Sequence, residues 1–176
     1  MKLDKNYPGL KQIENGDYVL ECDLTSEESI EIELDDRLVV RGSIITNKCI
    51  KVQRTLIAGC GIEAGWGIEA GEGIKAGEGI EAGWGIEAGE GIKAGCGIKA
   101  GCGIKAGKFI YSEKRIFAGI SVYHTNENCI KTIECAELRK GEICFGELKI
   151  RIIETVMTIA EIEAKLGIKN LKIKEN

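Results

Sequence analysis

Residues 65–82 read GWGIEAGEGIKAGEGIEA, and residues 83–100 read GWGIEAGEGIKAGCGIKA. The two stretches agree at 16 of 18 positions, so the chain repeats every eighteen residues as three hexads of the form G-I-(E/K)-A-G-(W/E/C). A hexad is too short to bury its own apolar side chains, and it gains stability only by stacking on its neighbours. Three hexads per repeat predict three short strands per coil, which is the form of a triangular, single-stranded parallel β-helix.

An aliphatic residue recurs every six residues well beyond this stretch. The series has sixteen members: Ile32, Leu38, Ile44, Ile50, Leu56, Ile62, Ile68, Ile74, Ile80, Ile86, Ile92, Ile98, Ile104, Ile110, Ile116 and Val122. Alanine lies two residues after each of the eight isoleucines of this series from Ile62 to Ile104, from Ala64 to Ala106. Each hexad therefore has a fixed aliphatic position and a fixed small position.

The same pattern excludes two other repetitive architectures. Collagen requires glycine at every third position and abundant proline, whereas this chain has one proline and breaks the three-residue rule. An α-helical solenoid would place two glycines per hexad inside helices, at a cost of about 1 kcal/mol each relative to alanine. We therefore expect an all-β fold.

Departures from the hexad rhythm divide the chain into four parts. We expect residues 1–31 to form a leader and cap, 32–122 the regular β-helix, 123–155 irregular terminal coils, and 156–176 a C-terminal tail. The tail contains Thr158-Ile159-Ala160-Glu161, a capping-box signature that predicts a two-turn helix ending at Gly167. A short strand is expected at residues 171–173.

The composition indicates no membrane segment, cofactor or metal centre. A net charge of −4 does not suit a nucleic-acid binder, so direct nucleic-acid binding is not expected. No apolar run is long enough for a signal peptide or a membrane span, and a cytoplasmic location with free thiols is the expectation. The eight cysteines include no C-x-x-C pair and there is one histidine, so no zinc site is predicted.

Two tryptophans are the leading candidates for partner binding. Trp66 and Trp84 occupy equivalent positions one repeat apart, and a ring of this size does not suit the small-residue slots of a narrow core. We therefore expect the two rings to stack on each other outside the coil, where exposed aromatic residues commonly anchor a partner. Glu72 and Glu90 form a second stacked pair of candidates.

Acidic residues gather in two further stretches. Residues 12–36 contain ten acids and no base, and Asp23, Glu27 and Glu28 from this stretch are candidates for steering a partner electrostatically. Residues 60–91 contain seven glutamates against Lys75 alone, whereas residues 92–108 contain four lysines and no acid. This asymmetry suits either a basic partner or head-to-tail contact between rods.

The six-residue period with its aliphatic positions resembles the hexapeptide-repeat, left-handed parallel β-helix proteins over residues 32–122. That family places a small residue four positions after the aliphatic one, whereas alanine here follows after two, so the handedness stays open with a left-handed coil as the expectation. The G-I-x-A-G rhythm is also similar to the bactofilin-like polymer-forming proteins, which implies filament assembly. Ile116-Phe117-Ala118-Gly119 and Phe145-Gly146-Glu147-Leu148 resemble segments in small proteins of phages and mobile elements.

These observations favour a non-catalytic protein that acts through the surface of its β-helix. We expect an inhibitor from a phage or mobile element that engages a host defence effector, either a protein or a nucleoprotein, and a homo-oligomer is compatible with this role. A self-assembling structural protein is the first alternative, and an enzyme similar to the hexapeptide acyltransferases is the second. That second resemblance implies a catalytic histidine on a coil and an inserted loop, but His124 follows the regular coils and the rod has no inserted loop.

Overall fold

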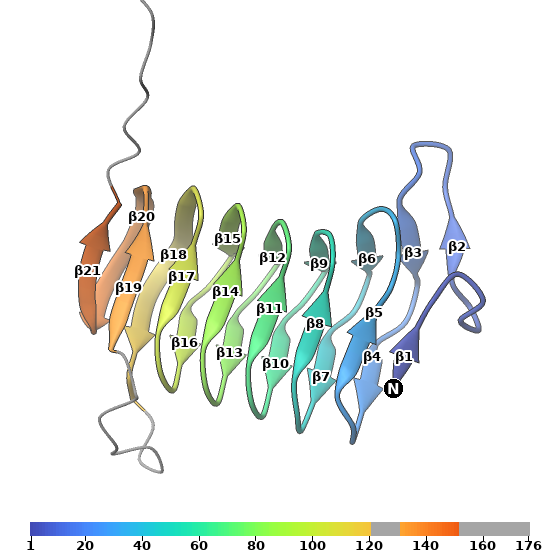
Figure 1. Cartoon of the computed structure of the whole chain (residues 1–176), viewed down its shortest axis with the longest axis horizontal. Coiled ribbons are helices and arrows are strands. Elements are labelled where there is room, and N and C mark those ends of the chain that lie inside the picture. The colour runs from blue at the N-terminus through green and yellow to red at the C-terminus, as the bar shows by residue number, and fades with distance from the viewer. Residues whose placement is uncertain (121–130, 152–176) are drawn as a thin grey trace, which may run out of the picture.

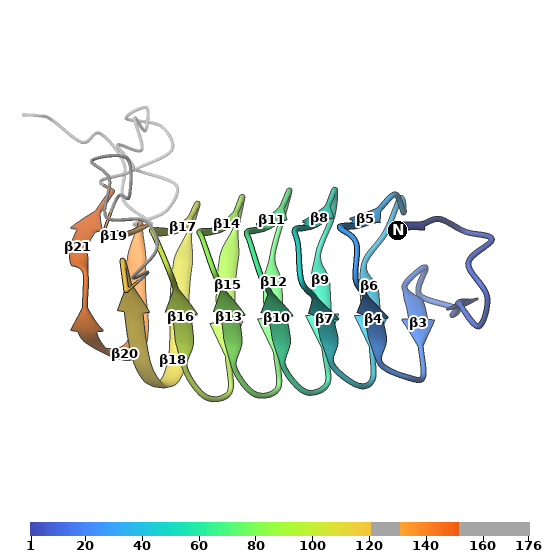
Figure 2. The ribbon, with the colours of Figure 1, turned by 90° about the horizontal axis from the view of Figure 1, so that it is seen from below.

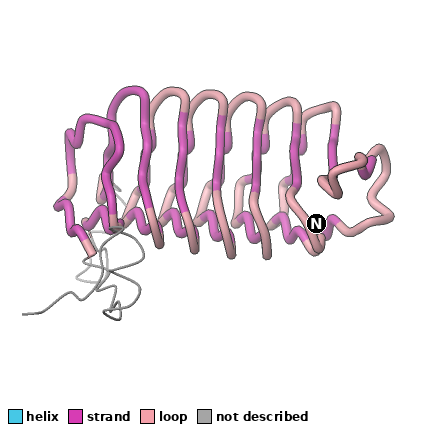
Figure 3. Tube along the Cα trace, turned by 90° about the horizontal axis from the view of Figure 1, so that it is seen from above, coloured by secondary structure: helices cyan, strands magenta, loops and turns pink. Residues whose placement is uncertain are grey.

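The computed structural model describes residues 1–120 and 131–151, and these form an all-β solenoid of about seven coils. Strands of successive coils stack in parallel into three long columns, called here the front, upper and lower sheets after their places in Figure 1. Strands and loops make up the whole described trace, with no helix among these residues (Figure 3). The prediction of an all-β parallel β-helix is therefore confirmed.

Every third strand of the regular coils belongs to the same sheet. The front sheet contains β1 (Lys2–Leu3), β5 (Ile30–Ile32), β8 (Ile50–Val52), β11 (Ile68–Ala70), β14 (Ile86–Ala88), β17 (Ile104–Ala106), β19 (Thr132–Cys135) and β21 (Glu147–Ile150). The upper sheet contains β2 (Lys11–Gln12), β3 (Tyr18–Leu20), β6 (Leu38–Val40), β9 (Leu56–Ala58), β12 (Ile74–Ala76) and β15 (Gly91–Ala94). The lower sheet contains β4 (Leu24–Ser26), β7 (Ile44–Thr46), β10 (Ile62–Ala64), β13 (Ile80–Ala82) and β16 (Ile98–Ala100). The long strand β18 (Phe109–Ala118) joins the upper and lower sheets and pairs with β20 (Glu137–Phe145).

The register between regular coils is eighteen residues. Ile62 aligns with Ile80, and Ile80 in turn aligns with Ile98. Residues at equivalent positions of the repeat therefore form columns along the rod, and Glu81 lies beside Lys99 at a position where the two repeats differ. This alignment confirms the predicted coil of three hexads.

Isoleucine and alanine fill the interior of each coil. In β13 the side chains of Ile80 and Ala82 are buried and Glu81 between them is exposed, and neighbouring regular strands repeat this pattern. The members of the six-residue aliphatic series from Leu38 to Ile116 are all at most 2% exposed. A large and a small side chain on each of three sides fill a narrow triangle at high density, which is the packing expected of a stable core.

The first coil is twenty residues long. Tyr18 aligns with Leu38 and Ile30 aligns with Ile50, whereas Ile32 aligns with Val52. The prediction that Ile32 begins the aliphatic column was therefore wrong by two residues, because the corner between β5 and β6 is two residues longer than the later corners. Residues 18–32, which the sequence assigned mostly to the leader, supply this first coil.

Polar contacts fasten the N-terminal segment onto the first coil. Strand β2 pairs antiparallel with β3 and continues the upper sheet beyond its first parallel strand. The Asp17 carboxylate accepts hydrogen bonds of 2.7 and 3.0 Å from the Arg37 guanidinium. The Asp35 carboxylate accepts hydrogen bonds from the Tyr18 hydroxyl at 2.8 Å and from the Lys5 ammonium group at 2.9 Å. The antiparallel strand protects an edge that would otherwise be open to pairing with another chain.

The coil is right-handed, which corrects the left-handed expectation drawn from the resemblance. In Figure 1 the front strands point upward while the chain advances from right to left, and Figure 2 shows the lower strands leading into the front sheet. A chain that rises on the near side while it advances to the left turns in a right-handed sense.

The last described coil leaves apolar side chains exposed. Leu148 and Ile150 of β21 align with Ile133 and Cys135 of β19, both of which are fully buried. Leu148 is nevertheless 37% exposed and Ile150 is 50% exposed, because no described strand stacks over them. Four sequence predictions lie outside the described residues: the sixteenth aliphatic position Val122, the polar loop 123–128 with His124, the helix beginning near Thr158, and the strand at 171–173.

Candidate binding surface

A column of corner residues runs along the rod where the lower sheet meets the front sheet. Lys48, Trp66, Trp84 and Cys102 occupy equivalent positions of four successive coils, and we call this column the tryptophan ridge. Its backbone is hydrogen-bonded from coil to coil, because the amide of Trp66 donates to the Lys48 carbonyl at 3.0 Å and the amide of Trp84 donates to the Trp66 carbonyl at 3.0 Å. The eighteen-residue register therefore fixes the spacing of these side chains.

The two indole rings stack on each other outside the coil. Their ring centroids are 6.0 Å apart and their planes differ by 14°. Trp66 is 53% exposed and Trp84 is 49% exposed, and they are the two most exposed aromatic residues among the described large apolar side chains. The predicted stacking and the predicted position outside the core are both confirmed. About half of the surface of each tryptophan residue is therefore exposed.

Four glutamates flank the tryptophans, and none of them is among the partner-binding residues predicted from the sequence. Each tryptophan has one glutamate three residues before it, on the lower sheet, and one three residues after it, on the front sheet. The four are Glu63, Glu69, Glu81 and Glu87. This regular spacing of three was the signal available in the sequence, because three residues separate the middle of each strand from the middle of the next corner.

Three of these four glutamates form ion pairs with lysines of neighbouring coils. Glu69 lies 3.3 Å from Lys51, and the other two pairs are Glu81 with Lys99 and Glu87 with Lys105. Glu63 has no ion pair within the described residues. All six paired side chains are about half exposed, so each ion pair contributes less than about 1 kcal/mol to the stability of the fold. Each glutamate can therefore leave its lysine for a cation of another molecule at little cost.

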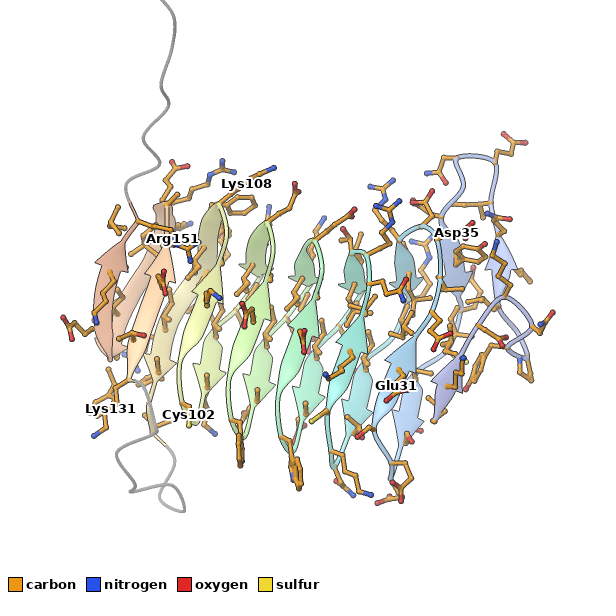
Figure 4. The ribbon with its side chains drawn as sticks, in the orientation of Figure 1. Glu31, Asp35, Cys102, Lys108, Lys131 and Arg151 are labelled. Carbon is orange, nitrogen blue, oxygen red and sulfur yellow. The ribbon has the colours of Figure 1, made fainter. Side chains whose placement is uncertain are left out.

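Glu72 and Glu90 lie on a different corner, between the front and upper sheets. Glu72 pairs with Arg54 at 2.7 Å and Glu90 pairs with Lys108 at 2.5 Å. In Figure 4, Lys108 marks this corner at the upper edge of the rod, while Cys102 of the tryptophan ridge lies at the lower edge. The structure therefore does not bring Glu72 and Glu90 together with the tryptophans.

The three N-terminal candidates contact the coil that follows them. Asp23 accepts a hydrogen bond of 2.7 Å from the backbone amide of Ser43, and Glu27 accepts one from the Asn47 side-chain amide. Glu28 forms an ion pair with Lys48, and this contact lowers the pKa of the Glu28 carboxyl. Through Lys48, Glu28 adjoins the end of the tryptophan ridge, whereas Asp23 lies at the corner between the upper and lower sheets.

A shallow hollow of about 1010 Å³ lies beside the ridge on the lower sheet. Figure 2 shows this sheet toward the viewer. The outward side chains along its length are Ile45, Glu63, Glu81, Lys99 and Phe117, and residues 113–115 and 140–142 close its C-terminal end. The outward residues thus change from the apolar Ile45 to the acidic Glu63 and Glu81 and then to Lys99 and Phe117. The acidic part of the hollow adjoins the tryptophan ridge.

Cysteines and other metal ligands do not gather into a site within residues 1–120 and 131–151. Seven cysteines in this part of the chain are free thiols, of which Cys135 is buried. Burial raises the pKa of the Cys135 thiol. No group of three or more histidine, cysteine, aspartate or glutamate side chains is placed to hold a metal ion in these ranges. None of the described segments forms a helix that is long and apolar enough to cross a membrane.

Comparisons with protein-family models, with curated protein sequences and with solved structures give no match to this chain.

Proposed function

We propose that this protein is a non-catalytic binding protein that holds a macromolecular partner against the tryptophan ridge. The observation that carries the proposal is the stacked, half-exposed pair Trp66 and Trp84. Large aromatic side chains supply much of the binding energy at protein interfaces, and exposing two of them on a monomer surface costs solvation free energy. A partner that covers the two rings recovers this free energy.

The biological role within this proposal is that of an inhibitor from a phage or mobile element that engages a host defence effector in the cytoplasm. Two segments support it through their resemblance to small proteins of such elements, and they are residues 116–119 and 145–148. Both lie in the C-terminal coils, in or next to β18, β20 and β21. A rigid rod with short corners offers an extended surface for covering such an effector.

A capture experiment tests the proposal. The full-length protein is immobilised and exposed to a lysate, and bound proteins are identified by mass spectrometry for the unchanged chain and for the Trp66→Ala/Trp84→Ala variant. We expect the double variant to lose its specific partner while it keeps its melting temperature, because neither ring lies in the core. The matched control is Glu72→Gln/Glu90→Gln on the other corner, which should retain capture. Equal capture by all three proteins would show that the ridge is not the binding surface.

Self-assembly is a second candidate, and one specific observation favours it. Leu148 and Ile150 occupy inward positions of the last described coil but are exposed, and a second copy stacked on this end would bury them. Light scattering on the full-length chain distinguishes the two candidates. Growth of particle mass with protein concentration, abolished by Leu148→Asp, would support assembly, whereas a constant monomer mass would contradict it.

A further inference from the structure

We infer that the tryptophan ridge recognises arginine side chains on its partner. The inference rests on the proposed function and adds the chemical class of the group that is bound. Its basis is the combination of two exposed indoles with carboxylates on both sides of them. Glu63 and Glu81 lie on the lower sheet beside the ridge, and Glu69 and Glu87 lie on the front sheet.

The carboxylates beside the ridge repel one another. Glu63 aligns directly with Glu81 across adjacent strands, and Glu69 aligns directly with Glu87. Like charges at directly opposed positions of neighbouring strands are destabilising. The lysines that offset this repulsion lie on the outer side of each pair, at Lys51, Lys99 and Lys105, so the centre of the cluster stays acidic. A cation supplied by a partner at this centre removes the repulsion.

The indole pair selects a planar cation. A cation held against an indole face is attracted by the negative quadrupole of the ring. Arginine presents a flat guanidinium that stacks on an aromatic ring and donates paired hydrogen bonds to a carboxylate, whereas the lysine ammonium group is compact and strongly hydrated. Both interactions are available at once where an indole adjoins a glutamate. The ridge therefore favours arginine over lysine.

The spacing of the rings determines where the guanidinium lies. A planar group inserted between two rings needs about 7 Å between their planes, since carbon atoms in contact are about 3.5 Å apart. The centroids of Trp66 and Trp84 are only 6.0 Å apart, so the rings do not admit a guanidinium between them. The group instead rests against the exposed part of an indole, with its donors directed to the flanking glutamates.

Intrinsic fluorescence provides a direct test, because Trp66 and Trp84 are the only tryptophans in the chain. Three short peptides of equal length serve as probes, with glycine alternating with arginine, with lysine or with glutamate. We expect the arginine peptide to change the fluorescence in a saturable way. The lysine peptide should bind about two- to five-fold more weakly. The glutamate peptide should not change the fluorescence. Binding should weaken near 0.5 M salt, where the Debye length falls to about 4 Å.

Charge-neutral variants locate the site. Glu63→Gln/Glu69→Gln should weaken binding of the arginine peptide by about two- to five-fold per residue, while Glu72→Gln/Glu90→Gln should leave it unchanged. Equal affinities for the arginine and lysine peptides, or equal affinities of the two variants, would overturn the inference. If the arginine peptide does not bind but lysate capture still depends on Trp66 and Trp84, the proposed function stands and only the partner class is wrong. If capture is independent of both tryptophans, the proposed function itself fails.

Discussion

A Cβ atom added to Gly77 would lie 2.0 Å from the carbonyl oxygen of Gly59, one coil earlier. Real Cβ atoms do not approach a backbone oxygen so closely, so a side chain at this position requires the two stacked corners to move apart. A Cβ atom added to Gly79, on the other side of Glu78, would lie 3.6 Å from the Gly97 carbonyl oxygen, which is ordinary contact. The two glycines of this corner therefore have different reasons to be present, although the sequence makes them look equivalent.

Replacing Gly77 with alanine should destabilise the protein, whereas replacing Gly79 should not. Gly77→Ala forces two stacked corners apart, and we expect a loss of about 1–3 kcal/mol in the free energy of unfolding. Gly79→Ala should change it by less than about 0.5 kcal/mol. Urea denaturation followed by circular dichroism measures both. Similar midpoints for the two variants would contradict the close approach of the corners.

Replacing Ile80 with aspartate should be far more harmful than replacing Glu81 with lysine. Ile80 is 1% exposed, so Ile80→Asp buries a charge that has no partner between two coils. We expect a loss of more than about 3 kcal/mol. Glu81→Lys places lysine beside Lys99, where the cost is limited to the loss of an exposed ion pair and a like-charge contact. Thermal melting of the two variants checks the expected order.

Removal of one whole coil should be tolerated. Deleting residues 65–82 joins Ala64 to Gly83, and every remaining column keeps its register because the deleted segment is one eighteen-residue repeat. Deleting residues 65–73 removes half of a coil and moves isoleucines out of the core. Circular dichroism and limited proteolysis should show a folded, shorter rod only for the first deletion. Equal resistance of both to protease would disagree with the three-sided coil.

Acid should loosen the N-terminal segment through Asp35. Hydrogen bonds from Lys5 and from Tyr18 lower the pKa of the Asp35 carboxyl from 3.8 to about 2. A lowered pKa in the folded state means that the ionised carboxylate stabilises the fold above pH 3.8 and that this contribution is lost as the pH falls toward 2. In Asp35→Asn this part of the pH dependence should vanish. Hydrogen exchange of the β1 and β3 amides between these two pH values measures the difference.

The sequence by itself determined the repeat length, the composition of the core and the stacking of Trp66 on Trp84. In a parallel solenoid the residue one repeat later is also the nearest neighbour in space, so a period in the sequence translates directly into contacts. The identity of the core residues follows for the same reason, since alternation along a three-residue strand places Ile80 and Ala82 on one side and Glu81 on the other.

Only the tertiary structure decided the hand of the coil, the longer first coil and the surroundings of the tryptophans. The six-residue period is the same for either hand, and a two-residue extension of one corner moved Ile30 rather than Ile32 into the column of Ile50. The period also left open which glutamates share a surface with the indoles. Glu72 and Glu90 repeat as regularly as Glu63 and Glu81, but they lie at a different corner of the coil, away from the tryptophans. A triangular coil places the three hexads of one repeat on three different sides, and the period alone does not say which side carries the tryptophans.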